Sequence, residues 1–274
     1  MTKRKPPEYQ PKKWQRNADA IRKAASLAHI RSMAANLIAH YRVPGSTPMR
    51  IPPIQDAASL CYLLYGAYRQ QYETEYLFGQ TAESWETLFL AAEAIVQAYA
   101  QGGEPANPAA ARAMRLYRDV PETVYALVTV NEWDAAVQFA EGKSPLLYAL
   151  LTGDDAAARS LLDELPETPA PEILRAEVYY TDPYFHKAIY TALLLGDAAA
   201  MQAAMEQRVK QYRKAMWDYS TVLDICSAAQ IKLAARRNLT VQLPIIELPE
   251  YYLDTSRRID RSRVKLPQIA PDEE

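Results

Sequence analysis

A short helix–turn–helix pattern occurs twice in this 274-residue chain, and no other feature constrains the fold as strongly. Residues 147–158 (LYALLTGDDAAA) match residues 190–201 (YTALLLGDAAAM) at an offset of 43, with seven identical positions. A weaker copy at residues 125–136 (YALVTVNEWDAA) carries Asn131 in place of the glycine. Each copy predicts an apolar helix that ends at a left-handed residue, because glycine and asparagine tolerate that backbone conformation.

The residue after each glycine predicts the start of a second helix. Asp154 and Asp197 follow Gly153 and Gly196, and aspartate at this place accepts backbone N–H groups of the next helix. The unit is therefore an antiparallel helical hairpin with a two-residue turn. Such periods are typical of architectures that stack hairpins and expose a long groove. The predicted fold class is all-α, with antiparallel helical hairpins stacked in a helical-repeat-like array and at most a short β-hairpin or extended segment.

The remaining organisation follows from composition and helix start and stop signals. Asp56 and Ser84 are expected to cap two of the early helices, whereas residues 72–79 fit either a short strand or an irregular helix end. The expected parts are a flexible basic arm (1–15), a single α-helical domain (16–255) made of N-terminal helices (16–101), helical hairpins (109–237) and an extended segment (239–255), and a peripheral tail (256–274).

The net charge of −2 conceals an uneven distribution. Residues 1–50 carry eleven basic and two acidic side chains, residues 51–200 carry eight and twenty-one, and residues 201–274 carry twelve and ten. The acidic middle of net −13 coincides with the hairpins and is the expected working surface, since an acidic face attracts a basic partner. The basic arm is expected to be a solubilising or self-docking tail, and nucleic acid is not the expected partner.

Catalytic and metal-binding patterns are sparse. His29 and His40 lack a zinc-site spacing, no glycine-rich phosphate loop is present, and Cys61 and Cys226 each lie in an apolar helical pattern typical of core cysteines. We therefore expect no enzyme, no metal and no cofactor. The N-terminus has no apolar signal region and no run of 18 apolar residues occurs, so a cytoplasmic protein without a membrane span is expected.

Residues 179–187 (YYTDPYFHK) form a dense polar–aromatic cluster with two interpretations. Asp182 before Pro183 is a good helix start, so the cluster fits a packed hairpin junction. Alternatively, Tyr179, Tyr180, Tyr184 and His186 line a recognition surface, because tyrosine and histidine anchor protein interfaces well.

The C-terminal half resembles the immunity 49 family of bacterial polymorphic-toxin immunity proteins over about residues 120–255. The resemblance lies in residues 182–197 (DPYFHKAIYTALLLGD), 228–234 (AAQIKLA), 239–243 (LTVQL) and 249–253 (PEYYL). It implies a bacterial protein that binds and neutralises a cognate toxin by stoichiometric inhibition. The implied partner is a nuclease or another basic effector domain, and a homo-oligomer is left open.

The function expected from these observations is toxin neutralisation through an acidic, tyrosine-rich surface. The residues expected at the toxin interface are Glu132, Asp134, Asp154, Asp155, Tyr179, Tyr180, Tyr184 and Asp197. The alternative is a helical-repeat adaptor or regulator that receives a peptide or protein partner in the concave face of the stacked hairpins.

Overall fold

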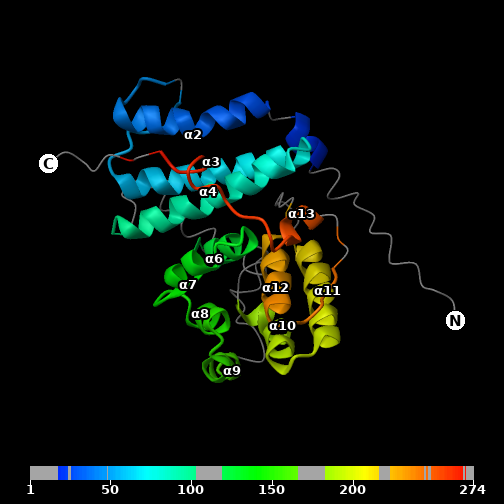
Figure 1. Ribbon diagram of the computed structural model, residues 1–274. Helices are drawn as coiled ribbons and strands as arrows, with labels where there is room; N and C mark the ends of the chain where they lie inside the picture. Colours follow the sequence, from blue (N-terminus) through cyan, green and yellow to red (C-terminus); the bar gives the residue numbers. More distant parts are fainter. Residues whose placement is uncertain are drawn as a thin grey trace.

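The computed structural model describes residues 18–23, 26–47, 49–102, 119–165, 183–215, 223–243, 245, 248–267 and 269. Throughout these ranges the regular structure is helical and no strand is present, which confirms the all-α prediction. A layer of long helices lies above a group of shorter hairpins (Figure 1). One continuous hydrophobic core runs from Ala34 to Leu266 and joins the two parts.

The upper layer contains α2 (Leu27–Arg42), α3 (Ala57–Leu77) and α4 (Thr81–Ala100). α3 and α4 are joined by a three-residue turn and pack along their length, and α2 packs against α3. As predicted, Asp56 caps α3 by accepting a 2.6 Å hydrogen bond from the Ser59 amide.

Residues 72–77, left open between strand and helix end, continue α3 to Leu77. The alternation of tyrosine and glutamate in this stretch does not reflect a surface strand, because Glu73 and Glu75 are buried with the tyrosine side chains. Glu75, 1% exposed, accepts hydrogen bonds from Arg31 Nε at 2.8 Å and from Thr87 Oγ1 at 2.7 Å. The ion pair and the hydrogen bond offset the free-energy cost of burying this carboxylate in a helix.

The predicted cap at Ser84 is wrong, since α4 begins three residues earlier at Thr81. Ser84 is buried in the first turn, where its hydroxyl donates to the Tyr72 carbonyl at 2.6 Å and lies 2.7 Å from the Tyr252 hydroxyl. The serine therefore ties α4 to α3 and to the C-terminal part of the chain. A short polar side chain that caps a helix and one that joins two helices are not distinguishable from local sequence.

The lower part consists of the three predicted hairpins, which stack in chain order. They are formed by α6 (Asp119–Thr129) with α7 (Trp133–Ala140), α8 (Pro145–Thr152) with α9 (Asp155–Asp163), and α10 (Pro183–Leu195) with α11 (Ala198–Ala215). The turns contain Asn131, Gly153 and Gly196, with φ values of 64°, 80° and 72°. The left-handed turns predicted from the repeat are confirmed.

Helix α12 (Ile225–Arg236) lies on the inner side of the hairpins and packs most extensively against α6 (Figure 1). Every side chain from Ile225 to Ala234 is buried. Polar contacts connect this helix to α6, α8, α10 and α11, all from residues at least 16 positions away. Within the described part of the chain, α12 therefore lies against α6 and makes polar contacts to α10 and α11.

The C-terminal segment returns from the hairpins to the upper layer. It includes the short helix α13 (Glu250–Leu253) inside the segment expected to be extended. Contrary to the expectation of a peripheral tail, Ile259, Val264 and Leu266 are buried in the core. Arginines and a lysine stand between these apolar residues in the sequence. The segment is short and has no helical periodicity, so its sequence does not predict that it packs against the core.

Candidate functional site: an open groove between α4 and α7

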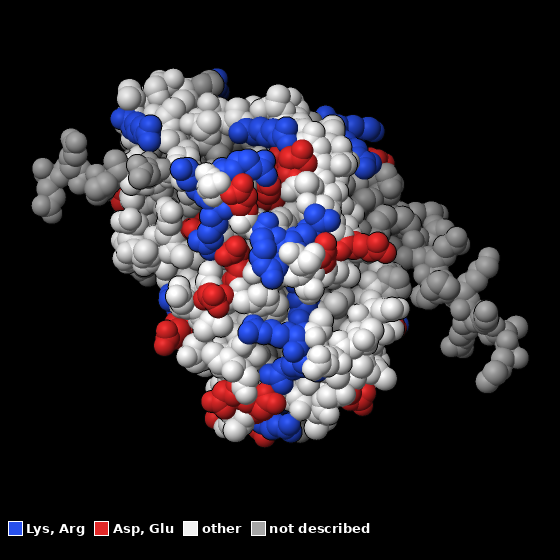
Figure 2. All heavy atoms as spheres, viewed as in Figure 1, with Lys and Arg blue, Asp and Glu red and all other residues white. Residues whose placement is uncertain are grey.

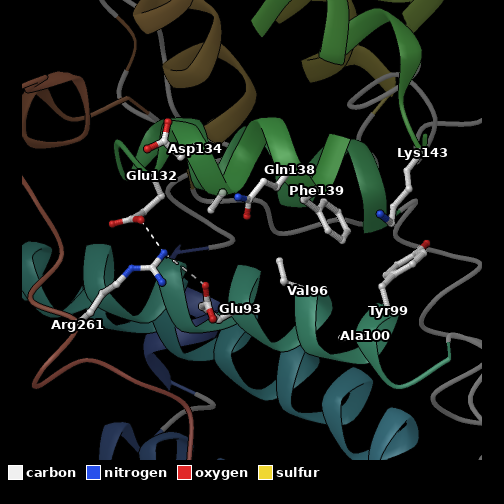
Figure 3. Close-up of a pocket in the computed structure, with 11 residues that line it drawn as sticks. Glu93, Val96, Tyr99, Ala100, Glu132, Asp134, Gln138, Phe139, Lys143 and Arg261 are labelled. Carbon is white, nitrogen blue, oxygen red and sulfur yellow. Dashed lines mark hydrogen bonds and ion pairs between the residues drawn. The ribbon is translucent and has the colours of Figure 1, made fainter. Parts of the chain in front are cut away.

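A groove of about 650 Å³ separates α4 from α7 at the junction of the helical layer and the hairpins (Figure 3). It combines charged, aromatic and small apolar side chains, unlike a purely apolar packing gap. The lining residues are Glu93, Val96, Tyr99, Ala100, Glu132, Asp134, Ala135, Gln138, Phe139, Lys143 and Arg261.

Two carboxylates and one guanidinium form the charged end of the groove. Arg261 donates to Glu132 at 2.6 Å and lies 3.7 Å from Glu93, as the dashed lines in Figure 3 show. Burial raises the pKa of Glu93, although Arg261 opposes the shift. Asp134 also lines the groove and is exposed, and Figure 3 shows its carboxylate pointing away from this cluster. The Arg261 guanidinium thus lies between two carboxylates at this end.

The other end is aromatic. Tyr99 and Phe139 meet edge to face, with ring centroids 5.3 Å apart and planes at 85°. The Lys143 ammonium lies 5.1 Å from the Phe139 centroid and 5.9 Å from that of Tyr99. Both distances are within the range of cation–π attraction, so Lys143 borders this end with a positive charge.

Local sequence explains how the side chains reach the groove. α7 begins just after the left-handed Asn131, which places Glu132 at its N-cap and Asp134 in its first turn. Carboxylates at a helix N-terminus are favoured by the helix dipole. On α4, Glu93, Val96 and Ala100 are spaced three and four residues apart and therefore share one face.

Two of the predicted interface residues, Glu132 and Asp134, lie in this groove. Asp155 lies instead beside a smaller pocket of about 260 Å³ on α8 and α12. There it forms a 2.8 Å ion pair with Arg237, whose hydrogen bond holds the pKa of Asp155 below its usual value.

The other predicted residues are not gathered at one place. Asp154 and Asp197 are exposed helix caps that accept from the amides of Ala157 at 3.0 Å and Ala200 at 2.9 Å. Tyr184 lies in α10, but its side chain falls outside the described residues, as do Tyr179 and Tyr180 entirely. His186, expected on the recognition surface, is instead buried in the core within hydrogen-bond distance of Gln230. Of the predicted residues that the structure describes, Glu132 and Asp134 are the two that line one groove.

The acidic middle of the chain is partly neutralised by arginines from outside it. Carboxylates of this region pair with arginines of the N-terminal and C-terminal parts in Arg31–Glu75, Arg237–Asp155, Arg261–Glu132 and Arg263–Glu86. Figure 2 accordingly shows basic side chains in a stripe down this face with acidic side chains interspersed among them. Counting charges along the chain overestimates the acidity of the folded surface.

Tyrosine content also has a mainly structural explanation in the described residues. Tyr62, Tyr65, Tyr68, Tyr72, Tyr125, Tyr190 and Tyr252 are buried. Both cysteines are buried as predicted, and burial raises the pKa of the Cys61 thiol to about 12 and that of Cys226 also. Neither thiol is poised as a thiolate.

Sequence reasoning missed Glu93, Tyr99, Phe139, Lys143 and Arg261. The first three lie on helices whose sequence pattern indicates only buried or solvent-exposed positions. They line the same groove because α4 packs against the hairpins. Arg261 joins Glu132 across 129 positions, so no local signal marks it.

Within the described residues, no cluster of three or more histidine, cysteine or acidic side chains is arranged to hold a metal ion. No helix in the same part of the chain has the length and apolarity needed to cross a membrane. Comparison with known proteins finds no matching family model, no matching curated protein and no matching solved structure.

Proposed function

We propose that this chain is an immunity protein that binds and neutralises a cognate bacterial toxin by stoichiometric inhibition in the cytoplasm. The observation that carries the proposal is an open groove with an aromatic end, lined by Glu93, Glu132 and the exposed Asp134. Complementary charge speeds the capture of a basic partner, and buried aromatic side chains stabilise the complex. The resemblance of residues 120–255 to the immunity 49 family supports the same function.

The test is protection in a bacterial host. The genes next to its own are searched for one that encodes a toxin domain, the protein is co-expressed with that domain, and survival is measured. We expect survival with the natural chain, and loss of protection with Asp134→Lys. Asp163→Lys is the matched control, because Asp163 is an exposed carboxylate at the end of α9 and does not line the groove.

Circular dichroism separates an effect on function from an effect on folding. Both variants should keep the helical circular dichroism of the natural chain, since each replaces an exposed side chain. Toxin killing that the natural chain does not reduce would overturn the proposal. The adaptor alternative predicts instead that the chain binds a peptide or protein partner without reducing toxin killing.

A further inference from the structure

A C-terminal strap (residues 254–267) follows α13 and contains no helix or strand. Its side chains and carbonyls contact the first hairpin turn and α4, both far away in the sequence. We propose, beyond the proposed function and independently of it, that Lys232 and Asn131 form a proton-sensitive latch at the root of this strap. Protonation of the buried amine favours opening of the strap.

The latch lies where α12, the first hairpin turn and the strap meet. Lys232 Nζ donates to the Thr129 carbonyl at 2.5 Å, to Asn131 Oδ1 at 2.8 Å and to the Asp254 carbonyl at 3.3 Å. The Asn131 amide donates in turn to the carbonyls of Asp254 at 2.9 Å and Arg257 at 3.0 Å. Lys232 therefore contacts the strap and also orients the amide that holds it, so the two side chains act as one hydrogen-bonded unit.

The charge of a protonated Lys232 is poorly compensated while the strap is closed. The residue is 1% exposed, and its three hydrogen-bond partners are neutral oxygen atoms. The Asp254 carboxylate attracts the ammonium, but it accepts from the Ser256 hydroxyl at 2.6 Å and lies 3.2 Å from the Arg257 guanidinium. Burial lowers the pKa of Lys232 to about 7, and the positive charges of Arg258 and Arg257 act in the same direction.

Proton linkage sets the direction of the pH effect. In the closed strap the Lys232 amine gives up its proton near pH 7, whereas in an open strap water reaches the amine and its pKa moves towards the ordinary 10.5. Between these values the open form binds more protons, so a rise in pH favours the closed form by up to about tenfold per pH unit. Below pH 7 both forms carry the proton, and opening is most favourable.

The rest of the strap is attached by few buried groups. Ile259, Val264 and Leu266 are its apolar side chains in the core. Its ion pairs to the helices are made by Arg261 and Arg263, whose side chains are 53% and 67% exposed. Exposed ion pairs contribute little to stability. A segment attached in this way opens more readily than the helices beneath it.

Opening of the strap would change the groove between α4 and α7. Arg261 lines this groove and lies between Glu132 and Glu93, as Figure 3 shows. When the strap opens, the guanidinium leaves, and the groove loses one wall and one positive charge. The latch therefore couples a pH near 7 to the shape and charge of the candidate functional site.

Thiol labelling of the full chain measures the opening. Val264→Cys places a thiol at a buried position of the strap, and peptide mass spectrometry follows its reaction with methyl methanethiosulfonate. At reagent concentrations where the rate stays proportional to reagent, dividing by the rate of the free strap peptide at the same pH gives the opening equilibrium constant. We expect this constant to fall at least about tenfold from pH 7 to pH 9. A constant that is unchanged or rises over this range would overturn the inference.

Cys226 serves as the internal reference for deeper unfolding, because this buried thiol lies on α12 and outside the strap. Relative to its own free peptide, the thiol of Val264→Cys should react at least about tenfold faster than Cys226 at pH 7. Equal relative rates at the two positions would show that the strap opens only when the helices unfold, and would overturn the inference.

Variants in the Val264→Cys background identify the titrating group. Lys232→Met should make strap opening independent of pH. Arg258→Gln removes an exposed cation that disfavours protonation, so opening should level off at a higher pH than in the natural chain. It also provides the test if Lys232→Met fails to fold. Lys265→Met is the matched control, because it removes an exposed lysine of the strap and should keep the natural pH profile. A natural profile in Lys232→Met or in Arg258→Gln would assign the titration to another group and overturn the inference.

Discussion

Lys232 lies on α12 with 1% of its surface exposed, and three oxygen atoms surround its ammonium group. Nζ donates to the Thr129 carbonyl at 2.5 Å, to Asn131 Oδ1 at 2.8 Å and to the Asp254 carbonyl at 3.3 Å. Burial lowers the pKa of this lysine to about 7, because carbonyl dipoles replace only part of the lost hydration. A single side chain therefore links α12, the first hairpin turn and the C-terminal segment.

The lowered pKa predicts a pH-dependent stability. The unfolded chain holds the Lys232 proton up to its ordinary pKa of 10.5, whereas the folded chain releases it near pH 7. Between these values the unfolded state binds more protons, so the free energy of unfolding rises with pH, with a slope approaching about 1.4 kcal/mol per pH unit. Lys232→Met should remove this contribution, and urea unfolding from pH 6 to 10 measures it.

The comparison isolates one residue, because other titrating groups are common to both proteins. The stability difference between the natural chain and Lys232→Met should grow in favour of the natural chain as the pH rises above 7. Lys265→Met, which removes an exposed lysine, should give a difference that does not change with pH. A difference for Lys232→Met that is equally constant would contradict the assigned pKa.

At the scale of elements, the hairpins and a helix over about residues 221–237 were predictable, whereas the burial of every side chain from Ile225 to Ala234 was not. Gly153 and Asp154 specify their turn with adjacent residues, so local sequence is sufficient. α12 contains Asp224 at its cap and Gln230 and Lys232 in its interior, a pattern that favours one solvated face. These groups are buried because partners from distant helices bind them, such as Arg208, 2.6 Å from Asp224. Only the tertiary arrangement provides those partners.

The turns allow a direct test of the left-handed positions. Gly153 has φ of 80°, and a Cβ added there would meet no atom within 4 Å. Gly153→Ala should therefore cost only the backbone term, about 1–2 kcal/mol of unfolding free energy in urea titrations. Gly66, inside α3, also has open space around a Cβ. Gly66→Ala should stabilise the protein by about 0.5–1 kcal/mol. A stability change of the same sign in both variants would contradict the conformational argument.

At the scale of the whole molecule, the charge of a surface region differs from the charge of the sequence segment that contributes its carboxylates. Folding pairs Arg261 with Glu132 and Arg263 with Glu86, so arginines from the C-terminal part neutralise carboxylates of the acidic middle. Two of the predicted residues, Glu132 and Asp134, line the groove, and carboxylates after a hairpin turn are locally recognisable. The sequence-based prediction placed Asp155 and Asp197 on the same expected surface, although one is ion-paired and the other caps a helix. Pairing across about 100 residues is decided by packing and has no local pattern.

Asn131 connects these scales, since it performs two tasks. Its backbone supplies the left-handed turn of the first hairpin, with φ of 64°. Its side-chain amide donates to the carbonyls of Asp254 at 2.9 Å and Arg257 at 3.0 Å, and thus holds the C-terminal segment on the hairpins. The glycines in the other two turns have no side chain for such a contact. The asparagine in the weak copy of the repeat is therefore a structural difference from the other copies, with a tertiary role.

Exchanging the turn residues separates the two tasks. Asn131→Gly keeps a residue that adopts the left-handed turn and removes the contacts to the C-terminal segment. We expect faster tryptic cleavage at Arg257 and Arg258, which follow α13, because the segment opens more often when its hydrogen bonds are lost. Gly196→Asn makes the reverse exchange in a turn without that contact and should leave the cleavage rate unchanged. Equal cleavage rates in the natural chain and Asn131→Gly would show that Ile259, Val264 and Leu266 hold the segment without the asparagine, whereas faster cleavage would identify this turn as its anchor.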